Sequence, residues 1–305
     1  MLDRFKRLRP ILKKQLVWYS FLIPTILCLI LLTYIPTFTS IKYSFYDVSI
    51  VGVGEKFVGL RNYKTLLSSS SFGKAVFNTI ILALLDLSVI PIGVILASLI
   101  NSLGKGKLQS FFRIGFYMPN VITGVSVILL FQVVLKEQGG ILNSFLSFMT
   151  QQPVEIGWLS NSMYSKFGAT IISIWRGSGY TMLISLAGLQ SIPSEIYEAS
   201  EVDGCSGLQK WIYITLPQMT KTFVFLLTTN LIASFSRFTD LYVLSGNSAS
   251  GRPGGSLQTI LMYIYQYSFE TPNYGMSSAG AMILFVIVFG VTLVNLKMTG
   301  FFKND

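Results

Sequence analysis

The chain has 305 residues, of which 51% are hydrophobic and 12% are charged, against roughly 25% charged in an average soluble domain. This composition excludes an ordinary soluble domain and indicates a membrane protein. The formal net charge of +10 is divided among short blocks between apolar segments, so it predicts membrane topology and no nucleic-acid partner. The sequence has no histidine and only two cysteines, Cys28 and Cys205. It therefore predicts no metal site, and it lacks the commonest proton carrier of enzymes.

Six apolar runs follow one another along the chain, each close to the ~20 residues that cross a bilayer as a helix. They predict an all-α integral membrane protein with six transmembrane helices. Pro91 and Pro119 are expected to kink their helices or to start them. The predicted spans are 16–36, 76–100, 115–135, 167–189, 222–244 and 278–296.

The N-terminal segment 1–15 is basic, and the apolar run after it is too long for a signal peptide and ends without a small-residue cleavage site, so an uncleaved anchor is expected. With the N-terminus in the cytoplasm, the cytoplasmic segments hold 13 Lys and Arg in 70 residues, and the external segments hold 8 in 103. Because Lys and Arg concentrate in cytoplasmic loops, segment 1–15 and the C-terminal tail 297–305 are both predicted to be cytoplasmic.

Four ionisable residues lie within the predicted spans or at their edges: Asp86, Arg176, Arg237 and Asp240. A charge at the bilayer centre costs ~2.5–3.5 kcal/mol on insertion scales, so these residues are expected to face a bundle interior or a water-filled cavity. Arg237 and Asp240 are spaced i, i+3 and can form an ion pair on one helix face. The alternative is that one of them lies on a translocation path. Gly177 and Gly179 lie within the fourth predicted span. They allow either close approach of another helix backbone or local unwinding of this helix.

The polar stretch 191–217 predicts an amphipathic helical hairpin on the cytoplasmic side of the membrane. Ser194 is expected to cap the first helix, and Asp203-Gly204 to end it. A second short helix is predicted from about Ser206 towards Pro217. From amphipathicity alone, the commoner interpretation of such a stretch is a surface loop that only shields helix ends.

The residues of this hairpin resemble the EAA loop of binding-protein-dependent ABC importers, specifically the sugar permeases of the maltose type. The resemblance rests on Glu198-Ala199-Ser200, on Asp203-Gly204 three residues later, and on Ile214-x-Leu216-Pro217. Departures at Ser200, Cys205 and Trp211 keep small residues small and the aromatic aromatic. Further segments that resemble the family are Phe57–Tyr63, Trp175–Pro193, Asp240–Leu244 and Tyr263–Tyr265.

The resemblance implies the transmembrane domain of a type I ABC importer in a bacterial-type cytoplasmic (inner) membrane. The domain would pair with a second permease, bind two ATPase subunits and receive a sugar from an extracytoplasmic solute-binding protein. Mg-ATP would bind the ATPase subunits, since this chain has no Gly-Lys-Ser/Thr phosphate loop, and the chain itself would not be an enzyme. The implied ATPase-coupling residues are Glu198, Ala199, Ser200, Asp203, Gly204, Leu208, Trp211, Leu216 and Pro217.

Aligned outward from the hairpin, the sugar-contacting positions of this family fall near Gly177 and Tyr180 in the fourth predicted span, and near Asn230, Ser234 and Arg237 in the fifth. Aromatic, amide and hydroxyl groups suit the C–H surface and the hydroxyls of a sugar. Arg237 is unexpected for a neutral sugar. It would either bind the carboxylate of an acidic sugar or pair with Asp240 or Asp86, and the sequence leaves these alternatives open.

Two other classes of protein are alternative interpretations of this sequence. An ion-gradient-driven secondary transporter would use Asp86 and Asp240 for proton coupling, but that mechanism calls for no EAA-like hairpin. A membrane enzyme would need a nucleophile, an acid or a metal constellation, and the only closely spaced carboxylates, within 195–203, belong to the hairpin.

Overall fold

The computed structural model describes residues 19, 21–49, 54–104 and 106–298, and this part of the chain is helical apart from one short β-ribbon. The predicted segment 1–15 and residues 299–305 of the predicted tail lie outside the described residues. In the ribbon, β1 (Tyr46–Asp47) pairs antiparallel with β2 (Lys56–Phe57). The helices and the three π-helical turns, labelled η, are η1 (Ile30–Tyr34), α2 (Ile35–Tyr43), α3 (Arg61–Ser68), α4 (Ser70–Asp86), α5 (Val89–Ser102), α6 (Lys107–Val121), α7 (Gly124–Val134), α8 (Ile141–Thr150), α9 (Ser165–Gln190), α10 (Ser194–Val202), α11 (Gly207–Lys210), η2 (Trp211–Thr215), α12 (Leu216–Gln218), α13 (Thr220–Phe235), α14 (Thr239–Leu244), α15 (Ile260–Tyr265), η3 (Gln266–Glu270) and α16 (Tyr274–Met298).

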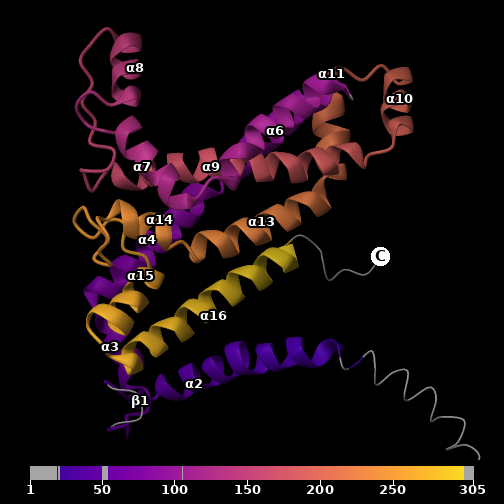
Figure 1. Ribbon diagram of the computed structural model, residues 1–305. Helices are drawn as coiled ribbons and strands as arrows, with labels where there is room; N and C mark the ends of the chain where they lie inside the picture. Colours follow the sequence, from indigo (N-terminus) through magenta and orange to yellow (C-terminus); the bar gives the residue numbers. More distant parts are fainter. Residues whose placement is uncertain (1–18, 20, 50–53, 105, 299–305) are drawn as a thin grey trace, which may run out of the picture.

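The long helices form an elongated bundle, with α10 and α11 at one end and the β-ribbon, α3 and α8 toward the other (Figure 1). α2 lies at the edge of the bundle and packs on α16 (Figure 1). The helical segment that contains α2 begins, and α16 ends, toward the end that carries α10. The described ends of the chain therefore lie on the same side as the hairpin.

Three helices in the described part of the chain are long and apolar enough to cross a membrane: Phe21–Tyr43, Ser70–Ser102 and Tyr274–Lys297. A fourth is present if α6 and α7, which are bent by 97° at their junction, form one broken span. α9, with 26 residues, has the length of a span but is less apolar. The predicted spans 115–135 and 222–244 are therefore not single straight helices.

The third predicted span is interrupted at Ile122 and Thr123. Both residues have extended backbone, with ψ of 141° and 135°. Pro119 lies in the last turn of α6, where its missing N–H removes a hydrogen bond to the turn before it. The prediction that Pro119 kinks its helix is refined, because the helix ends two residues after it. Pro91 lies in the first turn of α5, as predicted for a proline that starts a helix.

The fifth predicted span ends at Phe235 and restarts as α14 at Thr239. No proline or glycine lies at this break, which spans Ser236–Phe238. Phe238 adopts φ −139° and ψ −63°, outside the helical region. The break places Arg237 between two helix ends, where its side chain turns into the bundle.

α9 packs closely on α5 and α6 at glycine positions. A Cβ at Gly93 of α5 would lie 2.6 Å from Thr181 Cγ2, and a Cβ at Gly179 would lie 2.0 Å from the carbonyl oxygen of Phe116. α9 is continuous through Gly177 and Gly179. The structure thus confirms close approach of another backbone at Arg176–Tyr180, and it shows no unwinding there.

Replacing Gly179 with alanine is expected to lower the melting temperature of the purified protein, because the new methyl group cannot fit unless the backbone of α6 moves. Overpacking of this kind typically costs about 1–3 kcal/mol. Gly290→Ala in α16 is the matched control, since a Cβ at Gly290 meets nothing within 4 Å. Equal melting temperatures for the two variants, measured in the same detergent, would contradict the close packing of α9 on α6.

Candidate functional site

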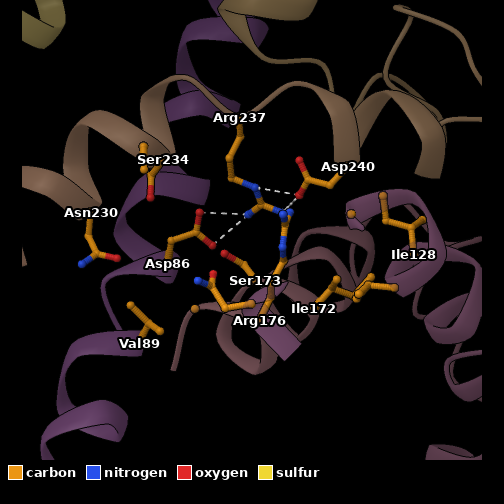
Figure 2. A pocket seen from close by; sticks show the side chains of 15 residues that line it. Asp86, Val89, Ile128, Ile172, Ser173, Arg176, Asn230, Ser234, Arg237 and Asp240 are labelled. Carbon is orange, nitrogen blue, oxygen red and sulfur yellow. Dashed lines mark hydrogen bonds and ion pairs between the residues drawn. The ribbon is translucent and has the colours of Figure 1, made fainter. Parts of the chain in front are cut away.

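A cavity of about 240 Å³ lies where α4 ends, α5 and α7 begin, and α9 and α13 pass. Val89, Val127 and Ile172 form apolar parts of its wall. Figure 2 shows Ser234, Arg237 and Asp240 on one side and Ser173 and Arg176 on the other. The polar and charged residues that line the cavity are Asp86, Asn120, Ser173, Arg176, Asn230, Ser234, Arg237 and Asp240.

Arg237 is the centre of a buried ionic network in this cavity (Figure 2). Its Nη1 donates to both carboxylate oxygens of Asp86, at 2.8 and 2.9 Å. Its Nε donates to Asp240 Oδ2 at 2.9 Å, and its Nη2 donates to the same oxygen and to the carbonyl oxygen of Ala169 at 3.1 Å. A guanidinium has five N–H donors. These contacts engage all three nitrogens of the Arg237 guanidinium with acceptors of the protein.

The network confirms the predicted pairing of Arg237 and shows that both candidate aspartates take part. Asp240 is the i, i+3 partner, and Asp86 comes from α4, 151 residues away in the chain. The side chains of Arg237 and Asp86 are only 8% and 4% exposed. Charges this deeply buried are tolerated because each is paired and hydrogen-bonded. Arg237 therefore fixes the break after α13 against the end of α4.

The predicted sugar-contacting positions are partly brought together by this fold. Gly177, Asn230, Ser234 and Arg237 line the cavity, whereas Tyr180 is not among its lining residues. Asn230 Nδ2 donates to the carbonyl oxygen of Leu226 at 2.8 Å, so its Oδ1 can accept a hydrogen bond from a ligand. Contact between these residues and a sugar stays a prediction.

Asn120 and Ser173 line the cavity, and sequence reasoning missed both. Asn120 stands directly after Pro119, and the 97° bend between α6 and α7 brings it to the cavity. Ser173 is one turn before Gly177 on α9, and both residues line the cavity. The helical spacing of Ser173 from Gly177 could have indicated it, because residues four apart share a face. No local signal marks Asn120.

The predicted cytoplasmic hairpin is present, with a different first cap. α10 begins at Ser194 itself, and its N-cap is Pro193, so the prediction that Ser194 caps this helix is wrong. Gly204 has φ +76°, the left-handed conformation that ends helices and favours glycine, as Asp203-Gly204 predicted. Ser206 forms a capping box with Gln209 at the start of α11.

Two contacts between its helices hold the hairpin together. Lys210 Nζ donates to Glu201 Oε1 at 2.6 Å, and this ammonium lowers the pKa of the Glu201 carboxyl. The hydroxyls of Tyr197 and Thr215 are hydrogen-bonded at 3.0 Å. The hairpin is therefore a folded unit rather than an extended loop.

The predicted coupling residues divide between the surface of the hairpin and its inner side. Leu208 is a large apolar side chain of the predicted set and is 71% exposed, and Val202, which is outside the set, is 89% exposed. Ser200 is buried, and its hydroxyl donates to the carbonyl oxygen of Tyr197. Leu216 is half-buried at the start of α12. The remaining exposed members of the predicted set are Glu198, Ala199, Asp203, Gly204 and Pro217.

Trp211 turns toward the bundle instead of the solvent. Its Nε1 donates to Ser98 Oγ of α5 at 3.1 Å. Its ring packs on an apolar cluster that contains Val89, Val94 and Leu226. Val89 is also a wall residue of the cavity, so α5 connects the hairpin to the cavity.

Comparison with known proteins gives consistent relatives over nearly the whole chain. The family described as "Binding-protein-dependent transport system inner membrane component" matches residues 89–298. The multiple sugar-binding transport system permease protein MsmF of Streptococcus mutans is 30% identical, and the match covers 97% of this chain and 99% of MsmF. The trehalose/maltose transport system permease protein MalF of Thermococcus litoralis is 30% identical, with 94% of each chain covered.

The fold also matches a solved structure of a bacterial ABC transporter involved in the import of the acidic polysaccharide alginate. The TM-score is 0.80, the sequence identity is 24%, and 96% of this chain and 98% of the other are covered. The fold is that of a type I ABC importer permease. The chain belongs to the family of inner membrane components of binding-protein-dependent transport systems. It is a multi-pass protein of the cytoplasmic membrane and a transport subunit rather than an enzyme.

Proposed function

We propose that this chain is the permease subunit of an ATP-driven oligosaccharide importer, and that its hairpin transmits the motion of the ATPases to the cavity. One observation carries this proposal. The hairpin exposes large apolar side chains, Val202 and Leu208, and the same hairpin is tied through Trp211 to α5, whose first turn lines the cavity. An exposed apolar patch on a small folded hairpin suits docking into a groove of a partner.

The chemistry of the cavity supports a carbohydrate as the transported solute. Asn120, Asn230 and Ser234 supply amide and hydroxyl groups beside apolar walls, which is the combination that binds a polar ligand with C–H faces. Relatives named for multiple sugars, for trehalose and maltose, and for arabinooligosaccharides support the same class.

The proposed assembly contains this chain, a second permease, two ATPase subunits that bind Mg-ATP, and an extracytoplasmic solute-binding protein. In it, six segments cross the membrane, with the third and fifth broken next to the cavity, and both termini lie in the cytoplasm. The hairpin and the described ends of the chain lie on the same side of the bundle, which supports this orientation (Figure 1).

The ion-driven alternative has less support from the site. A proton-coupling carboxylate must bind and release a proton during each cycle. Asp86 and Asp240 are both held by the Arg237 guanidinium, which stabilises their charged forms. The proposal therefore assigns them to the structure of the permease.

Reconstitution of the complete complex in proteoliposomes tests the proposed function. With the solute-binding protein outside and ATP enclosed, radiolabelled oligosaccharide is expected to accumulate, and the ATPase activity is expected to rise when the liganded binding protein is added. The control encloses a non-hydrolysable ATP analogue, which should abolish uptake. Uptake driven by a proton gradient through this chain alone, without ATPase subunits, would refute the proposal in favour of a secondary transporter.

A further inference from the structure

Arg176 is the charged residue of the cavity that the Arg237 network leaves out. It comes from α9, on the wall opposite Arg237 and Asp240 (Figure 2). Across the described ranges of the chain, no ion pair includes Arg176, and no residue accepts a hydrogen bond from its guanidinium. Two arginines thus reach one cavity in opposite states, since all three nitrogens of Arg237 contact acceptors of the protein and the donors of Arg176 are available.

α7 packs closely beside the guanidinium of Arg176. α7 begins with Gly124, and a Cβ there would lie 3.1 Å from Arg176 Nη1. A side chain at position 124 would press on the guanidinium. Because this position is a glycine, Arg176 keeps its place among the residues that line the cavity.

A half-buried guanidinium inside a membrane bundle is costly to keep unless a partner of opposite charge compensates it. The planar fork of an arginine matches a carboxylate, which can accept two parallel hydrogen bonds from it. Three of the charged groups that line the cavity, Asp86, Arg237 and Asp240, form a closed network with one surplus negative charge. An anionic ligand group is therefore expected to bind away from this network, on the Arg176 side.

The rest of the cavity suits the rest of a sugar ring. With its carboxylate on Arg176, the ring would present hydroxyls to Asn230 and Ser234 on the other side, where Oδ1 of Asn230 can accept. The volume of about 240 Å³ is below the ~300–1,000 Å³ typical of sites for drug-sized ligands. The cavity therefore suits a single sugar unit, and neighbouring units of an oligosaccharide would extend out of it.

We propose that Arg176 binds the carboxylate of a uronic acid unit, so that this permease selects acidic oligosaccharides. This inference rests on the proposed function. Arg176 is the proposed ligand of the substrate carboxylate, whereas the sequence alone had suggested Arg237 for this role.

The test uses the complete importer in proteoliposomes and matched pairs of trisaccharides. Each pair contains a uronate trisaccharide (galacturonate, mannuronate or glucuronate) and its carboxyl-reduced counterpart, which has the same backbone without the charges. The wild-type complex is expected to import at least one uronate trisaccharide with a kcat/KM about tenfold or more above that of its counterpart. Arg176→Gln is expected to lower uptake of that uronate by about 10- to 100-fold and to leave uptake of the neutral counterpart unchanged.

Two further variants separate selectivity from folding. Arg176→Lys keeps the charge but not the planar fork, so an intermediate preference for the uronate is expected. Arg113→Gln, the same substitution on α6 at an exposed position outside the cavity, is the control and should behave as wild type. All complexes receive the same solute-binding protein, so a change in preference between variants belongs to the permease.

The outcomes distinguish this inference from the proposed function. ATP-dependent import of neutral trisaccharides alone, or import of the uronate by Arg176→Gln with wild-type rate and affinity, overturns the role of Arg176 and leaves the proposed function standing. If Arg176→Gln does not assemble, an unchanged preference in Arg176→Lys overturns it. Absence of ATP-dependent uptake of any oligosaccharide overturns both.

Discussion

Replacement of Leu208 with aspartate is expected to abolish ATP-driven uptake while the permease itself stays folded. Leu208 is 71% exposed at the first turns of α11, so the substitution should change the stability of the isolated chain by no more than about 0.5 kcal/mol. At an interface the same change places a charge in an apolar groove, where central contacts cost about 2 kcal/mol or more when lost. Co-purification of the ATPase subunits with tagged permease, together with uptake in proteoliposomes, measures the effect.

Two controls limit the interpretation of this experiment. Leu208→Met keeps an apolar side chain of similar volume and should retain uptake. Gln218→Asp places a negative charge on an exposed residue directly after the hairpin, in α12, and should retain uptake as well. If Leu208→Asp binds the ATPases normally and imports at the wild-type rate, the exposed apolar surface of the hairpin is not the docking surface.

Replacement of Arg237 with glutamine is expected to be the most destabilising single change in the bundle. It leaves Asp86 buried without its cation and removes all five hydrogen bonds of the guanidinium. Removing one partner of a buried ion pair costs about 3–5 kcal/mol. At about 2–4 °C per kcal/mol, the melting temperature of the solubilised protein should fall by roughly 10 °C, and the yield of monodisperse protein should fall with it.

A charge-neutral variant provides the matched control for this prediction. The triple substitution Asp86→Asn, Arg237→Gln and Asp240→Asn removes the surplus carboxylates together with the guanidinium, so it should recover much of the lost stability. The variant also keeps groups that can hydrogen-bond to one another. A melting temperature for Arg237→Gln within 2 °C of wild type, on the order of one kcal/mol or less, would show that the network does not stabilise the break after α13.

The hairpin illustrates how much local sequence can predict. Gly204 ends α10 because a left-handed residue favours glycine, and Ser206 starts α11 because its hydroxyl and the Gln209 amide satisfy free backbone groups. These rules act over three or four residues, so they can be read directly. The wrong prediction of Ser194 as the N-cap also concerns neighbouring residues. Pro193 takes the N-cap position, because it already has the extended backbone that this position needs.

The ionic network illustrates what local sequence cannot predict. The i, i+3 spacing of Arg237 and Asp240 indicated their pairing, and Asp86 was an alternative partner, but no local pattern indicated that Arg237 binds both aspartates at once. The same limit applies to the breaks at Ile122–Thr123 and Ser236–Phe238. Both breaks lie inside a predicted span, because the average hydropathy that identifies a span does not detect a change in backbone direction.

The sequence by itself determined the class of this protein, because burial in a bilayer requires long apolar helices and a docking hairpin requires caps and turns of fixed composition. Only the tertiary structure decided which of the two arginines is available to a ligand. The availability of a charge depends on the groups packed around it in space, and Asp86 and Gly124, which settle the matter for Arg237 and Arg176, both lie far from them in the chain.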